Sequence, residues 1–118
     1  MRAIFFAAVL GALPASLGLA ADKLAPNAIK EQFFSGQEFT AATPAGVKFK
    51  MVFSADGKVT RMPADNSGAK GEGTWKLSKD GFCTTWKGAH QNCYTLVAAG
   101  SNKWSVMSHS SLRATWSK

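Results

Sequence analysis

The sequence predicts an all-β domain, a small antiparallel barrel or sandwich of about eight short strands with one short N-terminal helix. Three observations support this prediction. Apolar and polar residues alternate in short segments, turn-forming residues separate these segments at regular spacing, and only one segment has helical periodicity. The chain has 118 residues, of which about 21 form a leader, so it has room for one domain. We therefore expect residues 22–118 to form a single antiparallel β domain.

Residues 1–21 have the features of a secretory signal peptide. Arg2 supplies a positive charge, and residues 3–19 contain no charged side chain. The small Ala20 and Ala21 follow as a cleavage site. The apolar run is short for a bilayer core of about 30 Å, which argues against an uncleaved anchor. We expect export to the periplasm or the exterior, no transmembrane span in the mature chain, and an oxidising location in which cysteines pair.

The first element after the leader is a helix expected at residues 25–34. Pro26 suits the first helical turn, and Gly36 follows the segment as a stop signal. Ile29 and Phe33 lie four residues apart and therefore share one face. We expect this helix to form a short lid.

Three strands are expected next, at residues 38–43, 47–53 and 59–62. The second has the clearest period of two, because its apolar residues fall on every other position and share one face. Asp56 and Gly57 separate the second and third strands. They predict a two-residue type I′ hairpin turn, in which both residues need positive φ.

The second half of the chain predicts a meander of short strands. A polar loop at residues 63–71, rich in turn-forming residues, separates it from the first half. Evenly spaced short strands with turns between them favour an antiparallel barrel or sandwich over a parallel α/β sheet. The expected strands are residues 73–78, 82–87, 92–98, 103–108 and 111–117.

A register can be predicted for the first hairpin of this meander. If Asp80 and Gly81 form a two-residue turn, Trp75 lies directly opposite Trp86. The two tryptophans are then neighbours on one face of the sheet.

The cysteines set the register of the next hairpin. If Cys83 and Cys93 lie opposite each other and form a disulfide, Phe82 faces Tyr94. The two registers agree, since together they place the large apolar side chains on one face and the disulfide on the other. The face expected to be buried carries Trp75, Leu77, Phe82, Trp86, Tyr94 and Leu96.

Several of these segments also resemble a known group of proteins. Residues 53–59 contain Asp-Gly, residues 71–77 contain Gly-Thr-Trp, and residues 82–86 contain Cys-x-x-Trp. Cys93 follows. This pattern resembles small uncharacterised bacterial exported β-domain proteins, and its Gly-Thr-Trp strand is similar to strands of lipocalin-like and secreted protease-inhibitor barrels. The resemblance implies a small β domain of a bacterial cell envelope. It implies no activity and transfers no catalytic residue.

Aromatic side chains are the main candidates for a binding surface. They bury about 150–250 Å² each, so they can form the core alone. Alternatively, the barrel is partly open, and one or two rings line a pocket for an apolar ligand or a sugar face. We expect Trp116 to be partly exposed. The other candidates, as core or as ligand-lining residues, are Trp75, Phe82, Trp86, Tyr94 and Trp104.

The sequence predicts no catalytic residue, no metal site and no cofactor. His90 and His109 lie at expected turns and lack the spacing of metal ligands. Ser67 and Lys70 match a Ser-x-x-Lys nucleophile motif, but in a glycine-flanked loop rather than on a helical turn.

The charge balance is basic, with 14 Lys and Arg against seven Asp and Glu and a net charge of +7. Lys48 and Lys50 alternate with apolar neighbours and are expected to face outward, toward anionic polysaccharide or lipid. No basic-aromatic signature or recognition helix indicates nucleic acid. We expect a monomer.

Together these features predict an exported, non-enzymatic binding domain of the bacterial cell envelope that binds a small apolar ligand or an envelope partner protein. The alternative is a secreted or periplasmic protein similar to protease inhibitors. In that case the loop at residues 63–71, or the N-terminal arm, enters a protease cleft.

Overall fold

The computed structural model describes residues 23–65 and 68–118. The expected signal peptide therefore lies outside the described residues. Within them, the helix α2 spans Pro26–Phe33. The strands are β2 (Glu38–Ala42), β3 (Lys48–Phe53), β4 (Lys58–Pro63), β5 (Gly71–Leu77), β6 (Phe82–Trp86), β7 (Gln91–Gly100), β8 (Lys103–Ser108) and β9 (Ser111–Ser117).

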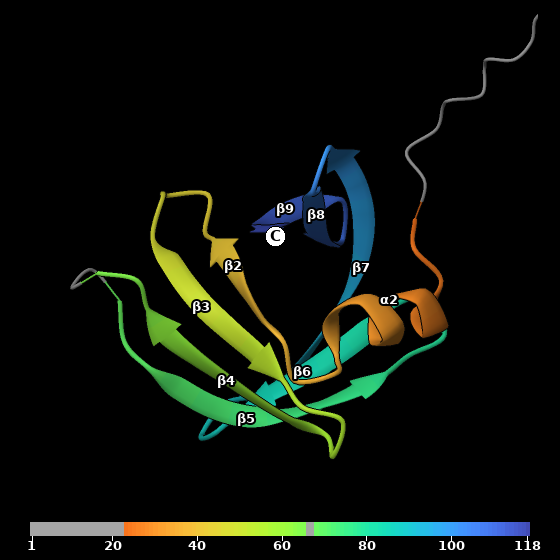
Figure 1. Ribbon diagram of the computed structural model, residues 1–118. Helices are drawn as coiled ribbons and strands as arrows, with labels where there is room; N and C mark the ends of the chain where they lie inside the picture. The colour runs from red at the N-terminus through yellow and green to blue at the C-terminus, as the bar shows by residue number, and fades with distance from the viewer. Residues whose placement is uncertain (1–22, 66–67) are drawn as a thin grey trace, which may run out of the picture.

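The strands form a closed antiparallel barrel in which each pairs with the next along the chain (Figure 1). The barrel closes where β9 pairs with β2, with Ala41 opposite Trp116. This architecture confirms the expected fold class and selects the barrel over the sandwich. Among the described residues, no helix is long and apolar enough to cross a membrane.

The closure of the barrel explains a wrong prediction about Trp116. We expected this ring to be partly exposed, but only 3% of it is accessible. Because β9 is held between β8 and β2, its inward side chains lie at the centre of the barrel. The Trp116 ring packs 4.6 Å from the ring of Phe39 and 5.4 Å from that of Phe53, measured between centroids.

Helix α2 fills one end of the barrel, next to the start of β2 (Figure 1). Ile29, Phe33 and Phe34 are buried. The Phe34 ring stacks on Phe53 with centroids 4.2 Å apart, and Phe33 meets Trp104 edge-on at 4.8 Å. The expected lid is therefore a plug, whose rings belong to the core.

The β3–β4 hairpin differs from the expected two-residue type I′ turn. Ser54 pairs with Lys58 through a backbone N–H···O bond of 2.8 Å, which leaves a three-residue loop. Within the loop only Gly57 has positive φ, at 93°. Asp56 explains the difference, because its Oδ1 accepts from the Ser54 hydroxyl at 2.6 Å and from the Lys58 N–H at 3.3 Å.

The β5–β6 register also differs from the expected one. Trp75 lies opposite Thr84, and Trp86 lies opposite Gly73. The strands close through the Ser78 N–H and the Gly81 carbonyl, so the loop is one position earlier than expected. Gly81 directly precedes β6, and only a glycine fits there because a Cβ would lie 2.0 Å from the Tyr94 carbonyl oxygen of β7.

The β6–β7 register is confirmed. Cys83 lies opposite Cys93 and the two form a disulfide, and Phe82 lies opposite Tyr94. The shift in the preceding hairpin moves the pairing by two residues and therefore leaves the predicted faces unchanged. Trp75 and Trp86 do point inward, although they are diagonal rather than opposite neighbours.

Candidate functional site

A cavity of about 150 Å³ lies inside the barrel, in the half that α2 does not fill. It opens at the end where β2 passes to β3, β4 to β5, β6 to β7 and β8 to β9. Aromatic side chains form much of its wall: Phe49, Phe53, Phe82, Trp86, Tyr94 and Trp116. The barrel therefore has a closed end, plugged by the helix, and an open end with an apolar interior.

An arginine interrupts this apolar wall. Arg61 follows Val59 by two residues on β4 and lies opposite the buried Met51, so its side chain starts inward. Its guanidinium carbon lies 4.6 Å from the ring centroid of Trp86 and 5.2 Å from that of Phe49. The Arg61 cation is thus held between two aromatic faces by cation–π attraction.

The stacked guanidinium has unused hydrogen-bonding capacity. The Arg61 Nε is buried and donates to no atom of the described residues. The ion pairs within those residues join Lys23 to Asp80 and Lys87 to Glu72, and neither includes Arg61.

Two glycines make room for this stack. Gly71 lies opposite Arg61, and Gly73 lies opposite Trp86, so β5 presents no side chain inward at this level. A Cβ at Gly71 would lie 3.1 Å from the Arg61 Nε. One at Gly73 would lie 2.3 Å from the Thr85 carbonyl oxygen. The bare stretch of β5 thus lets Arg61 lie against Trp86.

A residue with a buried hydroxyl, Thr84, lines the same cavity. Thr84 lies between Phe82 and Trp86 on the inward side of β6 and is only 4% exposed. Its Oγ1 is buried and has no hydrogen-bond partner among the described residues. A buried hydroxyl without a partner costs about 1–3 kcal/mol, so this position is unfavourable for the protein alone.

The rim of the open end is basic. Arg113 lines the cavity at a β-bulge in β9, where the pairing shifts between Val106 and Met107. Such a bulge redirects side chains. Other charged residues on strand ends and loops at this end are Lys48, Lys70 and Lys87, against Asp65 and Glu72.

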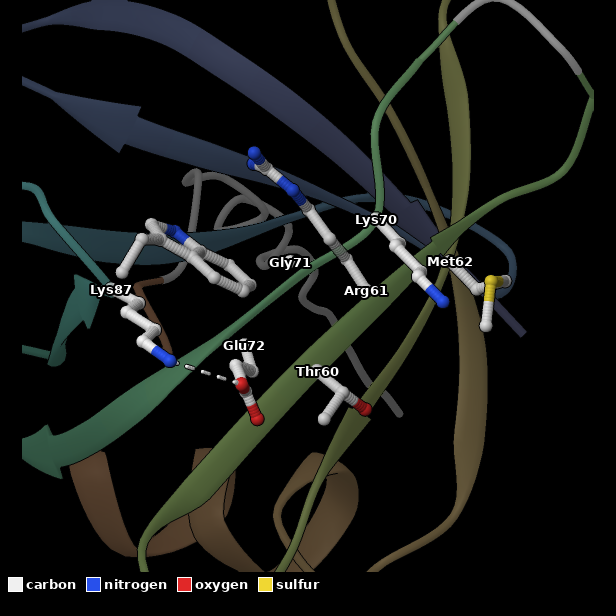
Figure 2. A pocket seen from close by; sticks show the side chains of 8 residues that line it. Thr60, Arg61, Met62, Lys70, Gly71, Glu72 and Lys87 are labelled. Carbon is white, nitrogen blue, oxygen red and sulfur yellow. Dashed lines mark ion pairs between the residues drawn. The ribbon is translucent and has the colours of Figure 1, made fainter.

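A groove of about 580 Å³ lies outside the barrel and borders the same stack (Figure 2). In Figure 2, Arg61 points away from Thr60 and Glu72, as the alternation along a strand requires. The Lys87 Nζ lies 3.9 Å from the Glu72 Oε2, and both side chains are well exposed. Because Arg61 and Trp86 line the groove and the cavity, their stack forms the wall between the two.

The residues expected to line a ligand site divide between the two ends. Phe82, Trp86 and Tyr94 line the cavity. Trp75 and Trp104 instead pack against the plug, with Trp75 4.5 Å from Phe34 between centroids. The Trp75 indole N–H donates to the Ser54 carbonyl at 2.8 Å, which ties this ring to the closed end.

Sequence reasoning missed Arg61 and Thr84. Arg61 was not among the candidate binding residues of the sequence analysis. The position itself carried the signal, because it lies two residues after the apolar Val59 on the same strand and therefore shares its face. Thr84 lies in the same way between two inward aromatic residues.

The remaining candidate residues lie away from the cavity. Lys48 and Lys50 are exposed on β3, and the Lys50 Nζ donates to the Thr40 hydroxyl at 3.4 Å. His90 and His109 are exposed at turns. Within residues 23–65 and 68–118, no group of three or more His, Cys, Asp or Glu is placed to hold a metal ion.

The inhibitor alternative concerns segments that are described only in part. The loop at residues 63–71 includes residues 66–67, which lie outside the described residues together with Ser67 of the Ser-x-x-Lys match. The N-terminal arm is described from Lys23 on, where Lys23 forms a bridge with Val97 and the Leu24 N–H donates to the Leu96 carbonyl at 2.8 Å.

Comparison with protein-family models, with curated proteins and with solved structures finds no significant match to this chain. The resemblance to exported β-domain proteins therefore stays an expectation.

Proposed function

We propose that this protein is a non-enzymatic binding protein that takes one small, largely apolar molecule into the open end of its barrel. The mouth of a β-barrel is a frequent ligand site, since strands hold the wall rigid while loops leave an entrance. The plug supports this assignment, because α2 supplies core rings at one end and leaves the other to the cavity.

The observation that carries the proposal is the composition of the cavity. Its wall combines aromatic rings with a few polar groups, the pattern of sites that bind organic molecules. A cavity of about 150 Å³ is large enough for a molecule of the size of benzene. The ligand class is therefore a ring or a short chain rather than a lipid or a peptide.

Binding of benzyl alcohol, followed by NMR, tests this proposal. We expect saturable shifts of the ring signals of Phe82 and Tyr94 in the oxidised mature chain. Ala41 and Ala114 both line the cavity, so A41L or A114L should fill it and abolish the shifts. A98L places the same bulk on an exposed position and should bind as the wild type does.

Two results would overturn the proposed site. One is the absence of saturable binding by every ring compound of that size that is tested, neutral or charged, benzyl alcohol included. The other is binding that persists unchanged in folded A41L and A114L, because the ligand would then lie outside the barrel.

The proposal also covers the location of the protein and its partners. The Cys83–Cys93 disulfide is compatible with an oxidising, exported location.

We further propose that the basic surface, including Lys48 and Lys50, holds the protein near anionic envelope components. Binding to vesicles containing an anionic lipid should then weaken with added salt, which screens charges beyond about 8 Å at physiological ionic strength. It should also weaken in K48E/K50E, and binding that survives both changes would contradict this part.

A further inference from the structure

Among the described residues, the Arg61 guanidinium at the cavity takes part in no ion pair, and its Nε has no hydrogen-bond acceptor. Moving a cation out of water is costly unless a counter-charge or hydrogen-bond acceptors replace the water. Here two aromatic faces, Phe49 and Trp86, hold the cation without neutralising it. The buried Nε of this guanidinium has no hydrogen-bond acceptor among the described residues, so its N–H remains available to another group.

The surroundings of Arg61 favour an anion as that group. The described residues that line the cavity include two arginines, Arg61 and Arg113, and no aspartate or glutamate. A planar guanidinium fork matches a carboxylate, to which it can donate two parallel hydrogen bonds. The basic rim draws anions toward the opening.

Thr84 supplies a second polar contact inside the same cavity. Its hydroxyl can both donate and accept, and it has no partner among the described residues. Arg61 on β4 and Thr84 on β6 thus line one apolar space, and each has one buried polar atom without a partner among the described residues. This is the arrangement expected when a ligand completes the hydrogen bonds.

We propose that the ligand is a small organic carboxylate. Arg61 binds its carboxylate, Thr84 contributes a hydrogen bond, and the aromatic wall holds its ring or short chain. This assignment rests on the proposed function and specifies its ligand class. It excludes neutral molecules as the preferred ligands and makes the stack a recognition element.

Matched pairs of acid and amide test the proposal by calorimetry or NMR. The probes are benzoate with benzamide, for a ring body, and hexanoate with hexanamide, for a chain body. We expect at least one acid to bind about tenfold more tightly than its amide, since a charge-assisted hydrogen bond has about that effect. The pair with the larger preference shows whether the ligand body is a ring or a chain.

Substitutions show which residues cause the preference for the acid over the amide. R61M should remove most of the acid preference, and R61K should keep only part, because a lysine lacks the planar fork. K76M removes one positive charge from the outer face of the neighbouring β5 and should keep the preference. T84V has nearly the same shape but lacks the hydroxyl, so it should lower the affinity for the acid.

A measurement on the unsubstituted protein avoids any dependence on folding of the variants. The Nε–H signal of Arg61 should shift on addition of benzoate or hexanoate and stay in place with the matching amide.

Equal affinity for acids and amides would overturn the carboxylate assignment and leave the proposed function standing. Failure of all four probes and of the neutral ring compounds would overturn both. An acid preference retained in folded R61M would overturn the role of Arg61.

Discussion

At the scale of single residues, the barrel interior departs from an apolar lining at a few adjacent positions. Arg61, Thr84 and Gly71 occupy inward sites where most other positions carry aromatic or aliphatic side chains. Each is unfavourable for folding alone: Arg61 is a half-buried cation, Thr84 has a hydroxyl without a partner among the described residues, and Gly71 is a glycine within a strand. Local departures of this kind are typical of functional sites.

The substitution T84V tests whether the hydroxyl acts in folding. Since the Thr84 Oγ1 has no partner in the protein, its removal should leave the free energy of unfolding unchanged or raise it by about 1–2 kcal/mol. Urea denaturation of the ligand-free protein measures this change. T85V, on the opposite side of the same strand, is the control. A loss above about 1 kcal/mol in T84V would show that the hydroxyl stabilises the fold.

Residue faces were predictable from the sequence, but residue roles were not. Alternation placed Phe82, Trp86 and Tyr94 on the inward face correctly. The same rule applied to Arg61 would have placed it inward as well, yet a basic residue is usually assigned to solvent. Sequence alone does not show that Phe49 and Trp86 enclose the guanidinium, because the three lie on different strands.

At the scale of elements, strands were predicted well and hairpin registers less well. The alternation fixes a strand over many residues, whereas a turn depends on one or two. Gly81 illustrates the difficulty, since a glycine can mark a positive φ or a close backbone approach. Here it marks the approach of Tyr94, and the loop therefore forms one position earlier.

The β3–β4 hairpin contains a pH-sensitive contact. The hydrogen bond from the Ser54 hydroxyl, with smaller help from the Lys58 N–H, holds the pKa of Asp56 below its usual value of 3.8. A lowered folded-state pKa stabilises the fold above the unfolded value, and this contribution is lost as the pH falls through the folded value. We therefore expect S54A to raise the pKa of Asp56 toward 3.8 and to remove this part of the acid sensitivity.

Carboxyl NMR titration of Asp56 measures this shift directly. S101A, which changes an exposed serine in another turn, is the control and should leave the titration of Asp56 unchanged. An unchanged pKa in S54A would mean that the hydroxyl does not set it.

The disulfide stabilises the β6–β7 hairpin through a short loop, since the cysteines are ten residues apart. Under the chain-entropy model, closing a loop of this length contributes about 2.5–3 kcal/mol. C83A/C93A should lower the free energy of unfolding by about that amount in urea, with reduced wild-type protein as the comparison. A loss below about 1 kcal/mol would show that the loop is already ordered in the unfolded chain.

At the scale of the whole molecule, the two ends of the barrel differ in composition and in role. The closed end collects the rings of α2 and of the adjoining strands into a continuous core. The open end keeps a cavity, a basic rim and the Arg61 guanidinium, whose Nε has no partner among the described residues. The helix and the eight strands of the described residues could be predicted from local patterns. The plug and the closure of β2 on β9 could not, because they join segments far apart in the chain.

This division predicts that stability and binding can be changed separately. Phe34 is 1% exposed and packs on Phe53 and Trp75, so F34A should cost about 3–5 kcal/mol of unfolding free energy. Trp86 is only half-buried at the open end, so W86A should cost clearly less, about 1–2 kcal/mol. W86A also removes one face of the Arg61 stack and should weaken acid binding, whereas folded F34A should keep the wild-type acid preference. Urea denaturation and the acid–amide titrations on both variants measure the two effects. Equal losses of stability would show that the open end belongs to the core, and the division between the ends would then be wrong.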